Sequence, residues 1–206
     1  MTAPGVFEVS IMQFQLKASA GYSLIELTLS LSILATVTGM AVPIVSSTID
    51  DIHAAGAARH VAARFAALRL DAVRRSSSLG FRFERQGADY AFTPFLDGNS
   101  NGIRTADVTA GIDQPVGRRE RLNESFANVS FGLLPGISDI DGNTGNPDGV
   151  RIGSSLFLSV SPNGSCTGGT LYVHGRRTQY AVRILGATGR ARFYRYDQGA
   201  RRWISR

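Results

Sequence analysis

A continuous apolar run from Gly21 to Val45 is the feature that most constrains this chain. Its side chains are almost all aliphatic, small or hydroxylic, and it carries one formal charge, that of Glu26. As an α-helix the run is long enough to cross the hydrocarbon core of a bilayer, which is about 30 Å thick. We therefore predict a membrane-spanning helix near the N-terminus. A carboxylate within an apolar span is energetically costly and indicates a functional position.

The residues around Glu26 form a recognisable signal. Residues 21 to 27 read Gly-Tyr-Ser-Leu-Ile-Glu-Leu, Lys17 precedes them, and Pro43 lies late in the apolar run. This arrangement resembles the class III signal of type IV prepilins and type II secretion pseudopilins, with Tyr22 in place of the usual Phe. The alternative interpretation is a plain signal-anchor helix whose Glu26 lies at the membrane interface.

The resemblance implies a maturation step. A prepilin peptidase is expected to cut between Gly21 and Tyr22 and to methylate the new N-terminus, so that Glu26 becomes the fifth mature residue. Glu26 is then expected to meet the N-terminal amine of a neighbouring subunit in a filament. Pairing two charges inside an apolar bundle offsets much of the cost of burying each one. Glu26 is therefore predicted to set the register between subunits.

The charges on either side of the run predict its orientation. Lys17 precedes the run, whereas the first charges after it are those of Asp50 and Asp51. Positive charge before the run, and none directly after it, agrees with the positive-inside rule. The resemblance implies a single-pass protein of the inner membrane with its C-terminal domain in the periplasm, and these charges are consistent with that orientation.

Beyond the run, the apolar pattern changes to that of an amphipathic helix. Apolar side chains recur at intervals of three and four, or their sums, as far as Leu68 and Ala72, and alanine, a strong helix former, is frequent between them. We predict one helix over residues 22–75, half in the membrane and half packed on a domain. It is preceded by a leader of residues 1–21, in which Met12 is predicted to be the true initiator.

Residues 76–206 show the alternation of short β-strands between Gly-rich turns, with no further helical period. We expect strands at 79–85, 90–95, 127–134, 155–161, 170–174, 179–185, 191–196 and 203–204. A long helix packed on an antiparallel β-sheet predicts the α+β class; the N-terminal resemblance implies the pilin fold. The insertion at 138–149 is predicted to be a long exposed loop, either flexible or partner-binding.

Short patches beyond the apolar run indicate a subgroup of the family that the N-terminal signal resembles. The passage Arg69–Arg85, the stretch 161–164 before Thr170 and the turn 188–190 resemble the GspH/FimT group of pseudopilins. This implies a minor pseudopilin of a type II secretion system, assembled with other pseudopilins into a periplasmic filament that serves protein secretion. The alternative is a FimT-like minor pilin of a type IV pilus that engages DNA or a surface.

The sequence offers no catalytic constellation. We find no nucleophile elbow, no phosphate loop and no Cys or His cluster, and Cys166, the single cysteine, is distant in sequence from His174. One cysteine cannot form an internal disulfide. His53 and His60 share roughly one helical face without partner ligands nearby, which favours packing or solvation over a zinc site. We predict that the chain is a substrate of processing enzymes and not itself an enzyme.

One insertion has the composition of a calcium loop. Asp97, Asn99 and Asn101 alternate and are followed by Gly102, the arrangement by which such loops offer oxygen ligands around a sharp turn. The closing bidentate Glu is missing, and Asp107 stands one residue early. Calcium is the cofactor candidate, with Asp97, Asn99, Asn101 and Asp107 as ligands. The alternative is a polar turn.

The C-terminal part is strongly basic. From Arg176 onward it contains nine arginines and one acid, Asp197, an excess larger than the net charge of +6 of the whole chain. Arginine favours bidentate phosphate contacts, and the interleaved aromatic residues are suited to stacking on bases. Residues 189–192 resemble the Gly-Arg-x-Arg element with which FimT-like minor pilins contact DNA. Arg190 and Arg192 are therefore the candidate nucleic-acid contacts, and an ordinary solvent-facing strand is the alternative.

Overall fold

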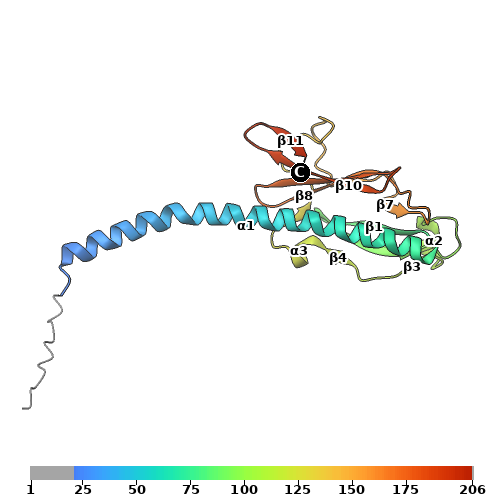
Figure 1. Cartoon of the computed structure of the whole chain (residues 1–206), viewed down its shortest axis with the longest axis horizontal. Coiled ribbons are helices and arrows are strands. Elements are labelled where there is room, and N and C mark those ends of the chain that lie inside the picture. The colour runs from blue at the N-terminus through green and yellow to red at the C-terminus, as the bar shows by residue number, and fades with distance from the viewer. Residues whose placement is uncertain (1–20, 206) are drawn as a thin grey trace, which may run out of the picture. The chain divides into compact units, whose positions relative to one another are not determined.

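The computed structural model describes residues 21–205. The predicted start at Met12, and the predicted leader apart from Gly21, lie outside the described residues. The chain divides into two compact units, one that ends at Pro43 and one from Ile44 onward. One long helix, α1 (Leu24–Arg75), contributes to both units (Figure 1) and covers nearly all of the range predicted to be helical.

The part of α1 in the first unit exposes its apolar side chains. Of the helices in the described part of the chain, α1 alone is long and apolar enough to cross a membrane. Four of its hydroxyl groups, those of Thr28, Ser32, Thr36 and Thr38, do not need water, because they donate to carbonyls about one turn earlier. A helix that satisfies its polar groups internally is suited to a hydrocarbon environment.

The second unit contains two antiparallel sheets, where the sequence predicted a single sheet. One sheet has the order β3-β2-β1-β7, with β4 also pairing with β2. Its strands are β1 (Leu79–Gln86), β2 (Asp89–Leu96), β3 (Gln114–Pro115), β4 (Glu120–Arg121) and β7 (Phe157–Val160). The other has the order β11-β10-β9-β8-β5, with β6 also pairing with β8. Its strands are β5 (Ser130–Phe131), β6 (Val150–Arg151), β8 (Gly169–His174), β9 (Gln179–Leu185), β10 (Arg190–Asp197) and β11 (Arg202–Ser205).

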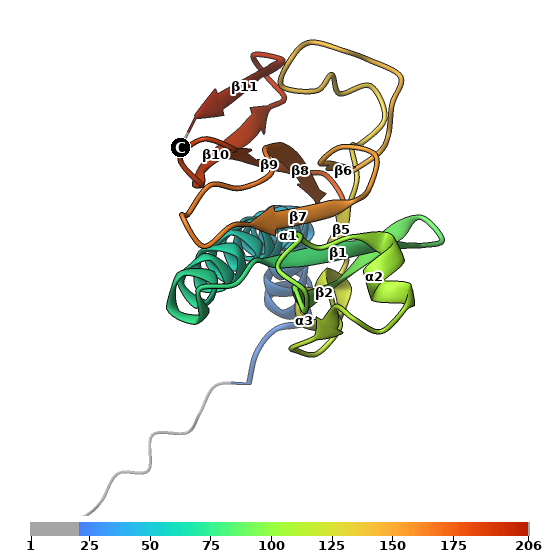
Figure 2. The same cartoon turned by 90° about the vertical axis from the view of Figure 1, so that its right-hand side faces the viewer.

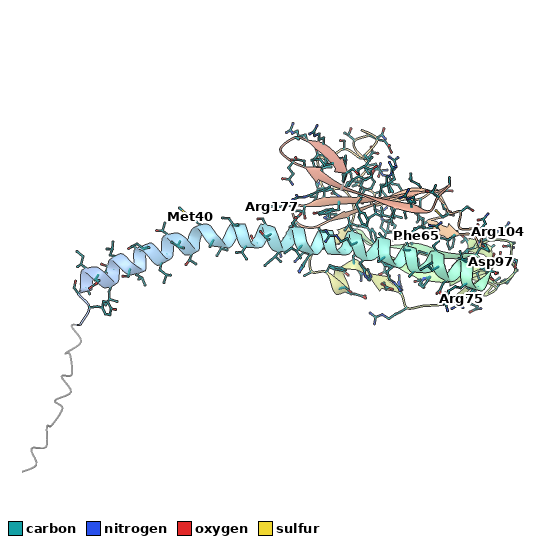
Figure 3. The ribbon with its side chains drawn as sticks, in the orientation of Figure 1. Met40, Phe65, Arg75, Asp97, Arg104 and Arg177 are labelled. Atoms are coloured by element: carbon teal, nitrogen blue, oxygen red, sulfur yellow. The ribbon has the colours of Figure 1, made fainter. Side chains whose placement is uncertain are left out.

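One face of α1 joins the two sheets (Figure 2). Its small residues Ala54, Ala57 and Ala58 are buried and bring the helix close to the strands, while Phe65 fills the centre of the core (Figure 3). The same core contains side chains from both sheets, among them Phe81, Phe83, Phe92, Leu171, Val173, Val182 and Ile184. The α+β class predicted from the sequence is confirmed.

Two details of residues 76–206, which we call the β domain, differ from the prediction. The domain contains two short helices, α2 (Thr105–Thr109) and α3 (Leu122–Ser125), so the expectation of no further helix was wrong. The predicted strand 127–134 shrinks to β5. Asn128 has a positive φ, which interrupts the extended backbone, and the N–H of Leu133 donates to a loop carbonyl, that of Pro147.

The insertion at 138–149 is exposed only over residues 141–147. Asp139 is buried, forms an ion pair with Arg151, and accepts hydrogen bonds from Asn143. The Arg151 guanidinium lies 5.1 Å from the centroid of the Tyr172 ring. The base of the loop is therefore packed on the outer face of the β8 sheet, which the exposed-loop prediction had not anticipated.

Candidate functional site

The predicted processing residues lie just ahead of α1. Gly21 has no heavy atom within 4 Å of the place where a Cβ would stand, and Tyr22 is 77% exposed. Glu26 lies in the first turn of α1 among exposed apolar side chains. An acid at this position interacts favourably with the positive end of the helix dipole. The bond between Gly21 and Tyr22 is accessible, and Glu26 has no ion pair within residues 21–205.

A carboxylate on α1 fastens the helix to the turn between β8 and β9. The backbone N–H groups of Arg176, Arg177 and Thr178 donate to Asp50 at 2.6, 2.9 and 3.1 Å, and the Thr178 hydroxyl donates to it at 2.9 Å. A Cβ at Gly175 would lie 2.3 Å from the Asp50 carboxylate, so this turn requires glycine there. Partial burial alone would raise the pKa of Asp50, but these hydrogen bonds outweigh it, and the pKa lies below its ordinary value of 3.8.

The neighbouring carboxylate extends this attachment to two further strands. Asp51 accepts a hydrogen bond from the Tyr180 hydroxyl of β9 at 2.9 Å and forms an ion pair with Arg195 of β10 at 3.2 Å. We call Asp50 and Asp51 with these partners the aspartate latch. The sequence analysis used both residues only as charges that follow the span. Their partners lie more than a hundred residues away, and no local pattern signals the contact.

The latch predicts a stability loss in Asp50→Ala. Four donors lose a charged acceptor, which we expect to cost about 2 kcal/mol and to lower Tm by roughly 4–8 °C. Because the folded-state pKa is below 3.8, this contribution is present above that pH and is lost as the pH falls through the folded-state pKa. Thermal unfolding of the full chain in detergent at pH 7 and pH 3 measures both effects.

The matched control is Asp71→Ala, which removes a half-exposed acid from the same helix. Within residues 21–205 its one ion pair is with Arg74 at 3.7 Å, and a largely exposed pair of this kind contributes less than about 1 kcal/mol. Equal Tm values for the two variants at pH 7 would contradict the latch.

The predicted calcium ligands surround a loop that backbone hydrogen bonds already close. The two carboxylate oxygens of Asp97 accept the N–H groups of Asn99 and Gly102, and the Asn99 side-chain oxygen accepts that of Asn101. Asp107 approaches the Asn99 amide at 3.5 Å. The loop lies at the end of the unit where α1 ends at Arg75 (Figure 3). Calcium binding here remains a prediction, and the polar turn of the alternative is present.

The loop contains a second acid, Asp113, that was not predicted from the sequence. Asp113 is 1% exposed, and its two carboxylate oxygens accept the N–H groups of Gly98 and Arg104 at 3.0 and 3.1 Å. It lies beyond the stretch that resembles a calcium loop, so composition gave no reason to include it. Across residues 21–205, no group of three or more His, Cys, Asp or Glu side chains is arranged to hold a metal ion.

If the Asp97 loop does bind calcium, the ion should raise the Tm of a fragment of residues 44–206. At an ion concentration ten times Kd, mass action adds about 1.4 kcal/mol, or roughly 3–5 °C. The increment should vanish in Asp97→Ala and persist in Asp141→Ala, which removes an exposed acid from the other insertion. A melt that does not change with millimolar calcium leaves the polar turn as the role of this loop.

Only part of the basic C-terminus is free to meet a partner. Arg183 is paired with Asp141 and Arg195 with Asp51. Arg190 and Arg192 lie two positions apart on one face of β10; both are exposed and neither forms an ion pair within residues 21–205. The structure therefore leaves the two candidate nucleic-acid contacts unpaired and uses some of the other arginines to hold the fold.

The remaining titratable candidates have packing contacts. His60 meets Glu120 at 3.0 Å, and His53 meets the carbonyl of Ala127 at 3.3 Å. The Cys166 thiol points to the carbonyls of Leu185 and Gly186, and burial raises its pKa. These contacts give no sign of a shared zinc site or of an activated thiol.

Comparisons with family models, with curated proteins and with solved structures found no match for this chain. Three features of the chain itself bear on its function: the residues around Glu26, the apolar helix that follows them, and the β strands that the aspartate latch attaches to the second unit's part of that helix.

Proposed function

We propose that the chain is a minor pseudopilin of a type II secretion system. It is processed by prepilin peptidase and assembles with other pseudopilins into a periplasmic filament that serves protein secretion. The main support for this proposal is the accessible Gly21–Tyr22 bond, which lies directly ahead of an exposed apolar helix with Glu26 in its first turn. A peptidase must be able to reach the bond that it cuts. Because a carboxylate in a membrane-spanning helix is energetically costly, its presence there favours a functional role.

The topology in this proposal is that of a single-pass inner-membrane protein with the β domain in the periplasm. Cleavage before the apolar run leaves the helix on the mature chain, whereas ordinary signal-peptide removal would discard it. The β domain, which has the helix-on-sheet arrangement expected of a pilin fold, is then presented by α1. Its role in the proposal is structural, and no catalytic step is assigned to it.

The direct test is the N-terminus of the mature protein. Mass spectrometry of the chain purified from a host with prepilin peptidase should find Tyr22 as the first residue, with one added methyl group. The chain from a peptidase-deficient host should keep its leader. A mature N-terminus beyond Val45, or a chain that is never cut in either host, would reject the proposal.

A second candidate function is supported by Arg190 and Arg192. A FimT-like minor pilin that binds DNA needs guanidinium groups free to meet phosphates, and these two are exposed without an ion pair in the described chain. Their spacing of two along β10 puts both on one face of the strand. This candidate shares the N-terminal signal and differs in what the β domain contacts.

This candidate predicts salt-sensitive binding of duplex DNA without sequence preference by the 44–206 fragment. Arg190→Gln combined with Arg192→Gln should weaken binding and reduce the slope of log K against log salt by up to ~2, because each arginine releases about one counterion. The control removes the same charge from Arg74 and Arg75 at the end of α1. Undetectable binding at low salt, or equal loss in both double variants, argues against a DNA site on β10.

A further inference from the structure

A cavity in the second unit lies beside the aspartate latch. Its volume is about 630 Å³, within the range of small-molecule sites, and it is open to solvent on one side. Side chains of α1 line one wall. The others are lined by the turns that precede β9 and follow β10, by the end of β10 and by Ile204 of β11. The function proposed above makes no use of this cavity.

The cavity is lined by equal numbers of positively and negatively charged side chains. Arg177 and Arg195 bring two guanidinium groups, and Asp51 and Asp197 bring two carboxylates. Arg195 is engaged with Asp51, whereas the Arg177 guanidinium is exposed and has no ion pair within residues 21–205. Asp197 uses one oxygen, Oδ1, to accept the N–H groups of Gly199 and Ala200. A ligand that carries both a phosphate and an amine complements such a site better than a purely anionic ligand does.

The position of the cavity in the chain indicates where such a ligand is found. Ser47 and Thr48 line it, and they follow Val45, the last residue of the apolar run, by two and three positions. Along an α-helix that is about 3 to 5 Å. The headgroup layer extends about 5 to 7 Å beyond the hydrocarbon core on each side, so a spanning α1 carries these residues into that layer.

We propose that this cavity binds the headgroup of a zwitterionic phospholipid, with phosphatidylethanolamine as the chemical class. The Arg177 guanidinium meets the phosphate, and the carboxylates of Asp197 and Asp51 meet the primary ammonium, which has three N–H donors. A choline headgroup has the same net charge but no N–H, and a glycerol headgroup has no cation. The inference rests on the membrane anchoring in the proposed function.

The test uses the full mature chain reconstituted in vesicles of equal parts phosphatidylethanolamine, phosphatidylcholine and phosphatidylglycerol. Native mass spectrometry after detergent extraction should find phosphatidylethanolamine retained at least about fivefold over either competitor. Arg177→Gln should reduce its retention about tenfold, the loss expected for one charge-assisted contact. Asp197→Asn, which keeps an oxygen for the turn, should abolish the discrimination against phosphatidylcholine.

The matched control is Arg104→Gln, which removes an exposed arginine at the opposite end of the same unit (Figure 3). It should retain the wild-type lipid preference. Among the described residues 21–205 no ion pair of the Arg177 side chain would be lost, so its variant is expected to fold. Equal retention of the three lipids, a preference for phosphatidylglycerol, or a preference unchanged in Arg177→Gln overturns the headgroup site alone. A chain that does not enter the vesicles overturns the membrane anchoring, and the proposed function with it.

Discussion

Gly21→Glu is expected to leave the chain at its precursor mass. The residue before the cut must fit a tight peptidase subsite, and a long charged side chain there should slow cleavage by about 100-fold or more, because misplacement of the reacting bond by 1 Å already has an effect of that order. An immunoblot of cells that contain prepilin peptidase, compared with a peptidase-deficient host, measures the loss. A band of mature mass for Gly21→Glu would count against a class III signal.

In this variant the effect on peptidase recognition can be separated from any effect on the protein's own structure. Gly21 has open space where a side chain would go, so Glu at this position strains nothing in the protein itself. A failure of cleavage then reports on recognition by the peptidase. Gly21→Ala is the control, since one methyl group should allow cleavage or merely slow it.

Glu26→Leu is expected to be cut and inserted normally but to be missing from the filament. The change makes the span more apolar, so insertion does not suffer. Loss of the carboxylate leaves the N-terminal amine of a neighbouring subunit buried without its partner, at a cost of about 3–5 kcal/mol. That cost corresponds to at least a hundredfold less incorporation, measured by immunoblot of sheared and sedimented filaments.

Two variants separate charge from shape. Glu26→Gln keeps the size and polarity of the side chain and should also fail to assemble, because the pairing needs a negative charge. Thr28→Leu removes a polar group from the same helical turn; its hydroxyl bonds only to the carbonyl of Ile25. It should assemble normally. Normal secretion in Glu26→Leu would show that the acid has no register role in this chain.

The elements that the sequence predicted well are those specified by local interactions. The hairpin of β1 and β2 follows from alternating apolar residues on either side of a turn in which Gly87 takes a positive φ. The strand 179–185 was predicted with the bounds that β9 has. The apolar residues of the long helix recur with the helical period. Its buried alanines lie where the sheets pack closely against it.

The features that the sequence did not predict depend on contacts between distant residues. Two sheets form because β7 pairs with β1, Leu79 opposite Val160, across an interval in which other strands join the second sheet. Asp50 and Asp113 both read as ordinary polar residues in the sequence. Each becomes structural only when the fold brings backbone N–H groups to its oxygens. Local patterns do not contain that information.

The aspartate latch also has a mechanical consequence. In the proposed filament, tension along α1 would enter the second unit near Ile44, where that unit begins. Asp50 and Asp51 lie within seven residues of that point and divide the tension between the β8–β9 turn and β10. Several hydrogen bonds that act in parallel share a load that none would bear alone. Within the second unit, the latch therefore couples the start of that unit's part of α1 to the sheet that carries Arg190 and Arg192.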